Sequence, residues 1–141
     1  YIQGVNNTLP QGDIDIQINF EETLHDSLLG ETVLEISNIN SIKTATIDIA
    51  LSDLSLLGMQ NVMTHELGHV LGLNHSSNEN DLMYFEKEKS EVREKKLCPS
   101  TLDIYALALI YHWIETPSYH PYYTTSVTLP DSIDNIVLAC S

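Results

Sequence analysis

The sequence predicts an α+β fold, in which a small twisted mixed sheet packs on one long helix. The first observation is an alternation of apolar and polar residues within residues 14–20, 32–37 and 44–51, which is typical of half-buried strands. The second is a helical spacing of apolar residues over 56–71, and again over 102–113. Strands that come first and helices that follow are the order of an α+β domain.

A chain of 141 residues fits a single domain, with a core over 12–114 and a C-terminal extension over 115–141. Turn-forming glycine, proline and asparagine residues at the start of the chain leave room for only a short extended piece there. Within the extension, we expect a strand over 124–129 and a short helix over 131–139. The chain begins at Tyr1, which leads us to expect a processed or trimmed fragment.

The boundaries of the two helices follow from residue types that cap helices. Ser52 or Asp53 is a candidate N-cap of the long helix, and Gly72 is the residue type that ends a helix in a left-handed turn. At the start of the second helix, Ser100 and Asp103 have the spacing of a capping box. Asparagines and a serine between the second and third strands favour a hairpin connection.

The acidic composition argues against nucleic acid as a partner. The net charge is −14, and five of the six basic residues fall within residues 86–96 beside four glutamates. That segment therefore sums to +1 and the rest of the chain to −15, so no basic surface stands clear of carboxylates. The segment has two interpretations: a patch that selects acidic substrates or, as we prefer, a solvated helix or loop with mixed-sign ion pairs. No apolar run is long enough to span a membrane.

Cys98 and Cys140 are the two cysteines of the chain. If they pair, the closed loop of about 43 residues would stabilise the fold by roughly 3–4 kcal/mol through the entropy of the unfolded chain. A disulfide would also fit an extracytoplasmic protein, although intracellular disulfides of hyperthermophiles are an exception. Two unpaired thiols are the alternative interpretation.

The densest cluster of reactive residue types is the stretch HELGHVLGLNH. Its first two histidines, His65 and His69, are four apart, so on a helix they share one face and can point at a single ion. A left-handed turn at Gly72 would bring the chain back, so that His75 supplies a third nitrogen. Three neutral imidazoles leave one position of a tetrahedral Zn²⁺ open, as in catalytic sites. Glu66 falls beside the metal, where its carboxylate can take a proton from zinc-bound water.

This stretch, with Met83 eight positions beyond it, resembles the metzincin clan of zinc peptidases, whose signature is HExxHxxGxxH followed by a tight turn that contains a methionine. Ser76 directly after the third histidine, and the spacing from that histidine to Met83, are similar to the matrixin family within the clan. The resemblance covers residues 12–114 and is strongest over 62–84. It implies a metzincin-like zinc peptidase fold and one catalytic Zn²⁺, supported from below by Met83 and held by His65, His69 and His75.

By this resemblance, the protein is a zinc-dependent endopeptidase in which Glu66 acts as general base and then as general acid. The strand near 31–37 would be the sheet edge along which a peptide lies extended. Leu34 on that strand, with Tyr84 and Phe85 after the methionine, are candidate substrate contacts. The partner would be a peptide or protein substrate. We expect a monomer, located outside the cell or at its surface, with a pro-segment or inhibitor that lies outside this chain.

Two alternative functions would use the same zinc site without hydrolysis of peptide bonds. The first is a zinc-holding interaction domain without peptidase activity, for instance one whose cleft is blocked by the C-terminal extension. The second is a non-peptide amide hydrolase that uses the same metal chemistry. Glu66 weighs against the first, because a module that only binds zinc does not need a carboxylate at that position.

The sequence also departs from the matrixin pattern. Phe85 stands where the family has a proline, and Leu102 stands where it has the first of two adjacent aspartates. Asp103 would be the second of that pair, and would brace the methionine turn. The first strand and first long helix of the family have no counterpart ahead of the predicted strands. We therefore expect the strand and helix of the C-terminal extension to fill that space, tied by Cys140 to Cys98.

Overall fold

The computed structural model describes residues 2–4, 16–36, 42–52, 54–84, 92, 94–111 and 127–140. Several predictions lie outside these residues: the N-cap at Asp53, most of the charged segment 86–96, the substrate contact at Phe85 and the first half of the strand at 124–129. Within the described residues, no helix is long and apolar enough to cross a membrane.

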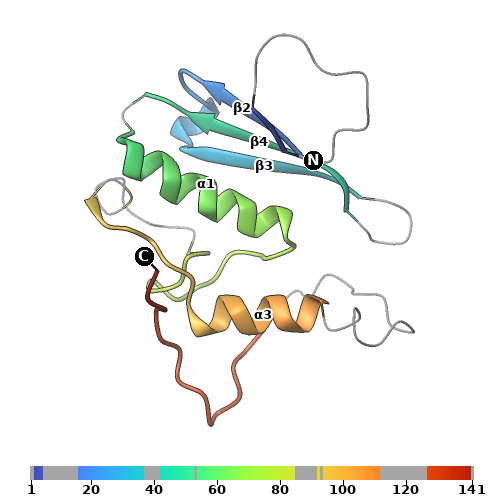
Figure 1. The fold of residues 1–141 in the computed structure, drawn as a ribbon, viewed down its shortest axis with the longest axis vertical. Coiled ribbons are helices and arrows are strands. Elements are labelled where there is room, and N and C mark those ends of the chain that lie inside the picture. Colours follow the sequence, from blue (N-terminus) through green and yellow to red (C-terminus); the bar gives the residue numbers. More distant parts are fainter. Residues whose placement is uncertain are drawn as a thin grey trace.

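The sheet is mixed, and its four described strands have the spatial order β1-β2-β4-β3 (Figure 1). β1 pairs in parallel with β2, and β2 in parallel with β4, whereas β3 runs antiparallel to β4 at the edge of the sheet. A short 3-10 helix, η1 (His25–Ser27), leads into β3. The predicted α+β class with a small mixed sheet is therefore confirmed. The strands are β1 (Ile2–Gly4), β2 (Ile16–Glu21), β3 (Gly30–Ile36) and β4 (Ile42–Ala50).

Helix α1 (Leu56–Val70) crosses one face of the sheet and packs against β3 and β4 (Figure 1). Its N-cap is Ser55, whose Oγ accepts a hydrogen bond from the Gly58 N–H at 3.0 Å. The prediction of Ser52 as the cap is wrong, because Ser52 still belongs to the turn after β4. There its N–H donates to the Glu22 carbonyl at 2.9 Å, which holds it away from the helix start.

The end of α1 turns the chain back toward the helix. Gly72 adopts a φ of 91°, in the left-handed region that glycine enters without strain. The Gly72 N–H donates to the His69 carbonyl and the Leu73 N–H to the Gly68 carbonyl, each at 2.9 Å, which is the pairing of a Schellman motif. The predicted stop at Gly72 is therefore confirmed, and the next residues return toward His69.

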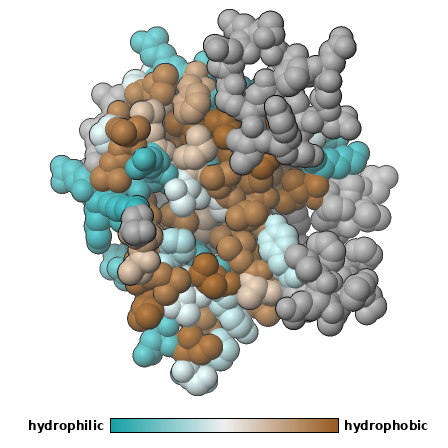
Figure 2. Space-filling view, viewed as in Figure 1, coloured by the Kyte–Doolittle hydropathy of each residue, from teal (hydrophilic) through white to brown (hydrophobic). Residues whose placement is uncertain are grey.

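Two apolar clusters hold these layers together. The larger lies between the sheet and α1, and its most deeply buried members are Ile47 and Ile49 of β4, both 0% exposed. Full burial of such a side chain contributes about 1.5–3 kcal/mol. The smaller cluster lies between the end of α1 and helix α3 (Thr101–Tyr111), and its buried members are Leu73, Leu82, Met83 and Ala106. Figure 2 shows apolar side chains gathered over the middle of the face that Figure 1 presents.

The described C-terminal residues contain no helix, so the prediction of a helix over 131–139 is wrong. After a turn, the chain runs extended, and its backbone pairs with the residues that open α3. The Leu138 N–H donates to the Pro99 carbonyl, and the Ile136 carbonyl accepts from the Thr101 N–H, both at 2.9 Å. In a helix, these backbone groups would form hydrogen bonds with one another, so only the extended chain can pair with the residues that open α3.

The described residues of the C-terminal extension therefore run beside α3, first on the side of α3 away from the sheet and then back to the start of α3 (Figure 1). Residues 127–129, the described part of the predicted strand, are irregular. The hypothesis that the extension fills space against the sheet is wrong for its described residues. A short strand, β1, does precede the predicted strands, and it occupies the position beside β2. A disulfide joins Cys98 to Cys140, with Cα atoms 5.8 Å apart, and ties the end of the chain to the segment that precedes α3.

Candidate active site

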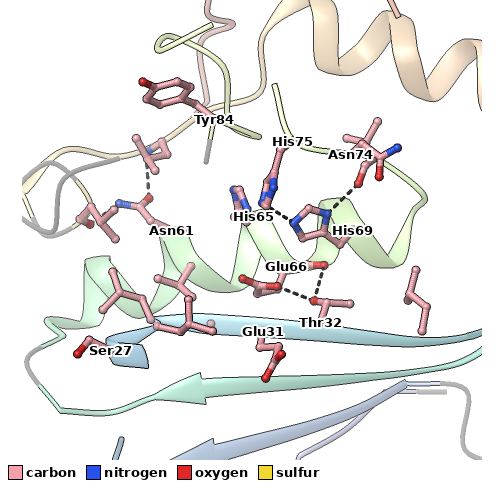
Figure 3. Close-up of a pocket in the computed structure, with 18 residues that line it drawn as sticks. Ser27, Glu31, Thr32, Asn61, His65, Glu66, His69, Asn74, His75 and Tyr84 are labelled. Atoms are coloured by element: carbon pink, nitrogen blue, oxygen red, sulfur yellow. Dashed lines mark hydrogen bonds between the residues drawn. The ribbon is translucent and has the colours of Figure 1, made fainter. Parts of the chain in front are cut away.

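Three histidines, from α1 and from the chain that follows it, converge on one point (Figure 3). His65 and His69 lie one turn apart on the same face of α1, and the turn at Gly72 returns the chain so that His75 faces both. One nitrogen from each ring lies within 4.8 Å of the others. In the part of the chain that the structure describes, this is the one group of histidine, cysteine or acidic side chains spaced to hold a metal ion.

Hydrogen bonds from the far nitrogens fix how two of the imidazoles are presented. His65 Nδ1 lies 2.9 Å from the Leu82 carbonyl oxygen, and His69 Nδ1 lies 2.8 Å from that of Leu73. Because a carbonyl oxygen only accepts, both Nδ1 atoms carry the proton, and a neutral ring then keeps Nε2 as its unprotonated nitrogen. His69 Nε2 in turn lies 3.2 Å from His75 Nε2. Nitrogen lone pairs that converge in this way suit a cation placed between them.

The surroundings also keep His75 neutral. Partial burial, followed by the nearby His69 and His65, lowers the pKa of His75 to about 4. A neutral imidazole is the form that binds a metal. Three such rings make the ligand set of catalytic zinc sites, in which the fourth position stays open. The donor set therefore fits Zn²⁺.

The carboxylate of Glu66 lies beside the histidines, and the residue is 5% exposed. Thr32 of β3 donates a hydrogen bond from its Oγ1 to Glu66 Oε2 at 2.6 Å (Figure 3). Gly30, on the same face of β3, leaves space for this carboxylate, since a Cβ there would lie 2.6 Å from Glu66 Oε1. Burial raises the pKa of Glu66, against the lowering effect of the Thr32 hydrogen bond and of His69. The carboxylate is thus held in place while it keeps affinity for a proton.

Met83 is 1% exposed and packs against α1. Its sulfur contacts Gly68, which lies between His65 and His69 in sequence, and a Cβ at that position would overlap the sulfur. The Met83 carbonyl accepts a hydrogen bond from the Ser76 N–H at 2.8 Å, so residues 76–84 form a closed loop. This loop therefore lies directly against the histidine cluster.

Asp103, at the start of α3, combines the two roles that its sequence position allowed. Its Oδ2 accepts the Ser100 N–H at 2.8 Å while Ser100 Oγ accepts the Asp103 N–H at 3.2 Å, which is a capping box. The same Oδ2 accepts the Leu82 N–H of the loop at 3.2 Å. Position 102 is leucine, and a second buried carboxylate comes from the loop itself, where Asp81 is 0% exposed.

A cavity of about 640 Å³ opens beside these groups, with β3 on one side and α1, residues 73–75 and Tyr84 of the loop on the other. Leu34 and Tyr84, two of the predicted substrate contacts, line it together with the histidines and Glu66. The third, Phe85, lies outside the described residues. The site thus combines a reactive polar cluster with an apolar recess, to which Leu28, Leu29, Val62, Leu73, Val92 and Leu97 contribute.

Three residues of the site belong to no motif and were not predicted. Thr32 could have been suspected only from its inward position in the strand alternation. Asn61 is buried on α1, and its amide makes three hydrogen bonds, to the backbone of Val92, Lys95 and Leu97. A polar residue on the apolar side of a helix was the available signal. For Asp81, a polar residue in a polar loop, the sequence carries no signal.

A comparison with protein families matches residues 6–112 of the chain to the family described as Matrixin. The match includes β2, β3, β4, α1 and α3, and it ends before the described C-terminal residues. Neither the curated proteins nor the solved structures gave a match. Since the matched stretch spans most of the chain and carries the mixed sheet, the histidine cluster and its neighbouring acid, this chain belongs to the matrixin family of metallopeptidases.

Proposed function

We propose that this protein is a zinc-dependent endopeptidase, in which His65, His69 and His75 hold one Zn²⁺ and Glu66 transfers the proton. The observation that carries the proposal is the convergence of three imidazoles, within 4.8 Å, beside a buried carboxylate. When bound, Zn²⁺ supplies a Lewis acid that polarises a carbonyl and lowers the pKa of water. Met83 supports the site through its contact with α1 and is not a ligand.

Glu66 is the general base of this proposal. It takes a proton from the water that attacks the scissile carbonyl, and it then delivers that proton to the leaving nitrogen. Burial raises the pKa of Glu66, which favours holding the proton between the two steps. The hydrogen bond from Thr32 limits rotation of the carboxylate, so Glu66 meets the reacting groups in one orientation.

The substrate would be an extended peptide that lies along β3. Among the described strands, β3 pairs with β4 only, so its other edge can offer main-chain N–H and C=O groups to a peptide. Such pairing gives affinity without regard to side chains, which suits an enzyme that cuts proteins. Leu34, Tyr84 and Phe85 are the proposed contacts for substrate side chains.

We also propose that the protein works as a monomer, outside the cell or at its surface, on peptide or protein substrates. The Cys98–Cys140 disulfide supports this location, because such bonds persist in oxidising compartments. A pro-segment or a separate inhibitor would control the site. The net charge of −14 argues against nucleic acid as a partner.

Cleavage of an unfolded protein, followed with and without a zinc chelator, tests the proposed activity. E66A should still bind one equivalent of zinc and should lose about 10²–10⁴-fold in kcat, the usual contribution of a positioned acid–base group. The matched control is E22A, which removes an exposed glutamate after β2 and should cleave like the unchanged protein. Zinc binding by the unchanged protein without any cleavage would instead favour a zinc-holding interaction domain.

A further inference from the structure

The loop of residues 76–84 touches the histidine cluster at both of its ends. At one end, Ser76 directly follows His75. At the other, the Leu82 carbonyl accepts the hydrogen bond from His65 Nδ1 at 2.9 Å. The conformation of this loop therefore affects where two of the three imidazoles point.

Asp81 links the two ends of the loop from inside the protein, where it is 0% exposed. Its Oδ2 accepts a hydrogen bond from the Ser76 hydroxyl. Its Oδ1 accepts a hydrogen bond from the amide Nδ2 of Asn135 at 2.6 Å. A buried carboxylate is stable only when hydrogen-bond donors replace the water that it has lost, so each of these two donors matters to the loop.

Asn135 lies in the C-terminal extension, 54 residues from Asp81 and beyond the residues that match the matrixin family. Its Oδ1 accepts the N–H of Leu102 at 3.0 Å, in the first turn of α3. The carbonyl of the next residue, Ile136, accepts a hydrogen bond from the N–H of Thr101 at 2.9 Å. One amide side chain therefore links the start of α3 to the loop beside the histidines.

We propose that Asn135 is a positioning residue for the metal site: through Asp81, it fixes the loop that orients His65 and His75. The inference takes the identity of the metal from the proposed function, and it adds a role for a segment outside the family match. Asp81 is fully buried and Asn135 is half-buried, so the amide of Asn135 supplies a donor that the Asp81 carboxylate could not replace with water. The C-terminal extension is thereby part of the site's framework.

Reversal of donor and acceptor gives the sharpest test. N135D replaces the donating amide with a second carboxylate facing Asp81, so the two acceptors repel and the loop shifts. In D81N/N135D, the amide at position 81 can donate to the carboxylate at position 135, while its oxygen still accepts from the Ser76 hydroxyl. The carboxylate at position 135 also still accepts the Leu102 N–H. The double variant therefore restores every hydrogen bond of the network with one polarity reversed.

Zinc affinity, measured by competition with a chelator on protein shown to be folded, is the first readout because it needs no catalysis. N135D should bind Zn²⁺ at least about tenfold more weakly, the lower end of the usual loss when a ligand's supporting partner is removed. Its kcat should fall while KM changes little, and D81N/N135D should recover most of both losses. Q60E, which likewise turns an amide into a carboxylate but at an exposed position of α1 outside the cavity, is the matched control and should behave like the unchanged protein.

The inference is overturned if N135D keeps the zinc affinity and kcat of the unchanged protein, or if D81N/N135D binds zinc no better than N135D. Should N135D fail to fold, the double variant decides alone: a folded protein with near-normal zinc affinity supports the pairing, and an unfolded one overturns it. Absence of cleavage by the unchanged protein would count against the proposed function only, because chelator competition would still report on Asn135.

Discussion

The two walls of the cleft are held by different kinds of interaction. The strand wall is β3, whose backbone pairs with β4 along its whole length. From this strand, Thr32 donates a hydrogen bond to Glu66 and Gly30 leaves space for its carboxylate. The loop wall is residues 76–84, of which Tyr84 lines the cavity. Besides its own turn hydrogen bonds, this loop is held to the rest of the protein by buried Met83 and by two buried carboxylates, Asp81 and Asp103. One wall is thus positioned by a repeated backbone pattern and the other by a few particular side chains.

This difference indicates how each wall responds to change. A strand shares its position among many ladder hydrogen bonds, so a single substitution alters what touches Glu66 but leaves the wall in place. In the loop wall, loss of one donor leaves a buried charge short of partners, and the network around it weakens as a unit. We therefore expect changes in the strand wall to reduce turnover, and changes in the loop wall to reduce stability and zinc affinity.

Removal of the disulfide should have the largest effect, because the disulfide holds the segment from which Asn135 contacts Asp81 of the loop wall. C98S/C140S should lower the free energy of unfolding by about 3–4 kcal/mol, the value expected from the entropy of the unfolded chain. Urea unfolding, followed by circular dichroism, measures the change. Equal unfolding midpoints for the unchanged protein with and without a reductant would contradict this prediction.

Two glycines allow a matched comparison of the walls. In G68A the new Cβ meets the sulfur of buried Met83, so the loop wall is displaced, and the free energy of unfolding should fall by about 1–3 kcal/mol, together with zinc affinity. In G30A the new Cβ meets both the Glu66 carboxylate and Cγ1 of buried Val62, each at 2.6 Å. The free energy of unfolding should therefore fall here too, but kcat should fall by up to about 10²-fold at unchanged zinc affinity. Circular dichroism melts, chelator competition and peptide cleavage separate the two. The same loss pattern in both variants would remove the distinction between the walls.

Loss of the Thr32 hydroxyl should have a smaller effect, confined to turnover. T32V keeps the shape of the side chain but cannot donate to Glu66, so kcat should fall about tenfold, which corresponds to about 1.4 kcal/mol in the barrier. T32S keeps the hydroxyl and should retain most of the activity. KM and zinc affinity should stay unchanged in both. Equal kcat values for T32V and T32S would show that the hydrogen bond does not position the base.

The smallest effect concerns the solvent end of the strand wall, where His25 lies 3.3 Å from Asp26 and 3.0 Å from Glu31. Hydrogen bonds to Asp26 and then to Glu31 raise the pKa of His25 above 6.5. Since the pKa of the folded form is the higher one, the stability that these contacts add is fully present below pH 6.5 and is lost as the pH rises through the folded pKa.

An NMR titration of the His25 ring measures this shift. D26N and E31Q should each lower the pKa of His25, because each removes a carboxylate whose hydrogen bond raises it. A pKa that is the same in both variants and in the unchanged protein would contradict the prediction. Activity should not change in either case if the strand wall is positioned by its backbone.

The strand wall and α1 could be predicted from the sequence because their signals are local. Alternation with period two marks β2, β3 and β4, and the histidine spacing with Gly72 leads to the cluster that the structure brings together. The sequence predicts the start of α1 at Ser52 or Asp53, whereas the N-cap is Ser55, because a hydrogen bond still holds Ser52 to the residue after β2. That hydrogen bond, from Ser52 to Glu22, joins residues that no periodicity connects.

The supports of the loop wall could not be predicted, because they join residues far apart in the chain. Asp81 meets its donor Asn135 across 54 residues, and Thr32 meets Glu66 across 34. The sequence predicts a short helix over 131–139, whereas backbone pairing with the residues that open α3 selects an extended chain. Such tertiary pairing outweighs local preference and leaves no trace in the pattern of a single segment.

The Cys98–Cys140 disulfide affects what self-digestion, in which one copy of a peptidase cleaves another, would do to this chain. Because the bond closes a covalent ring around α3 and the extension, a single cut anywhere between the two cysteines leaves both pieces attached to each other. Asn135 would stay tethered close to Asp81 after such a cut. Self-digestion in this part of the chain would therefore leave the enzyme in one piece until a reductant opened the ring.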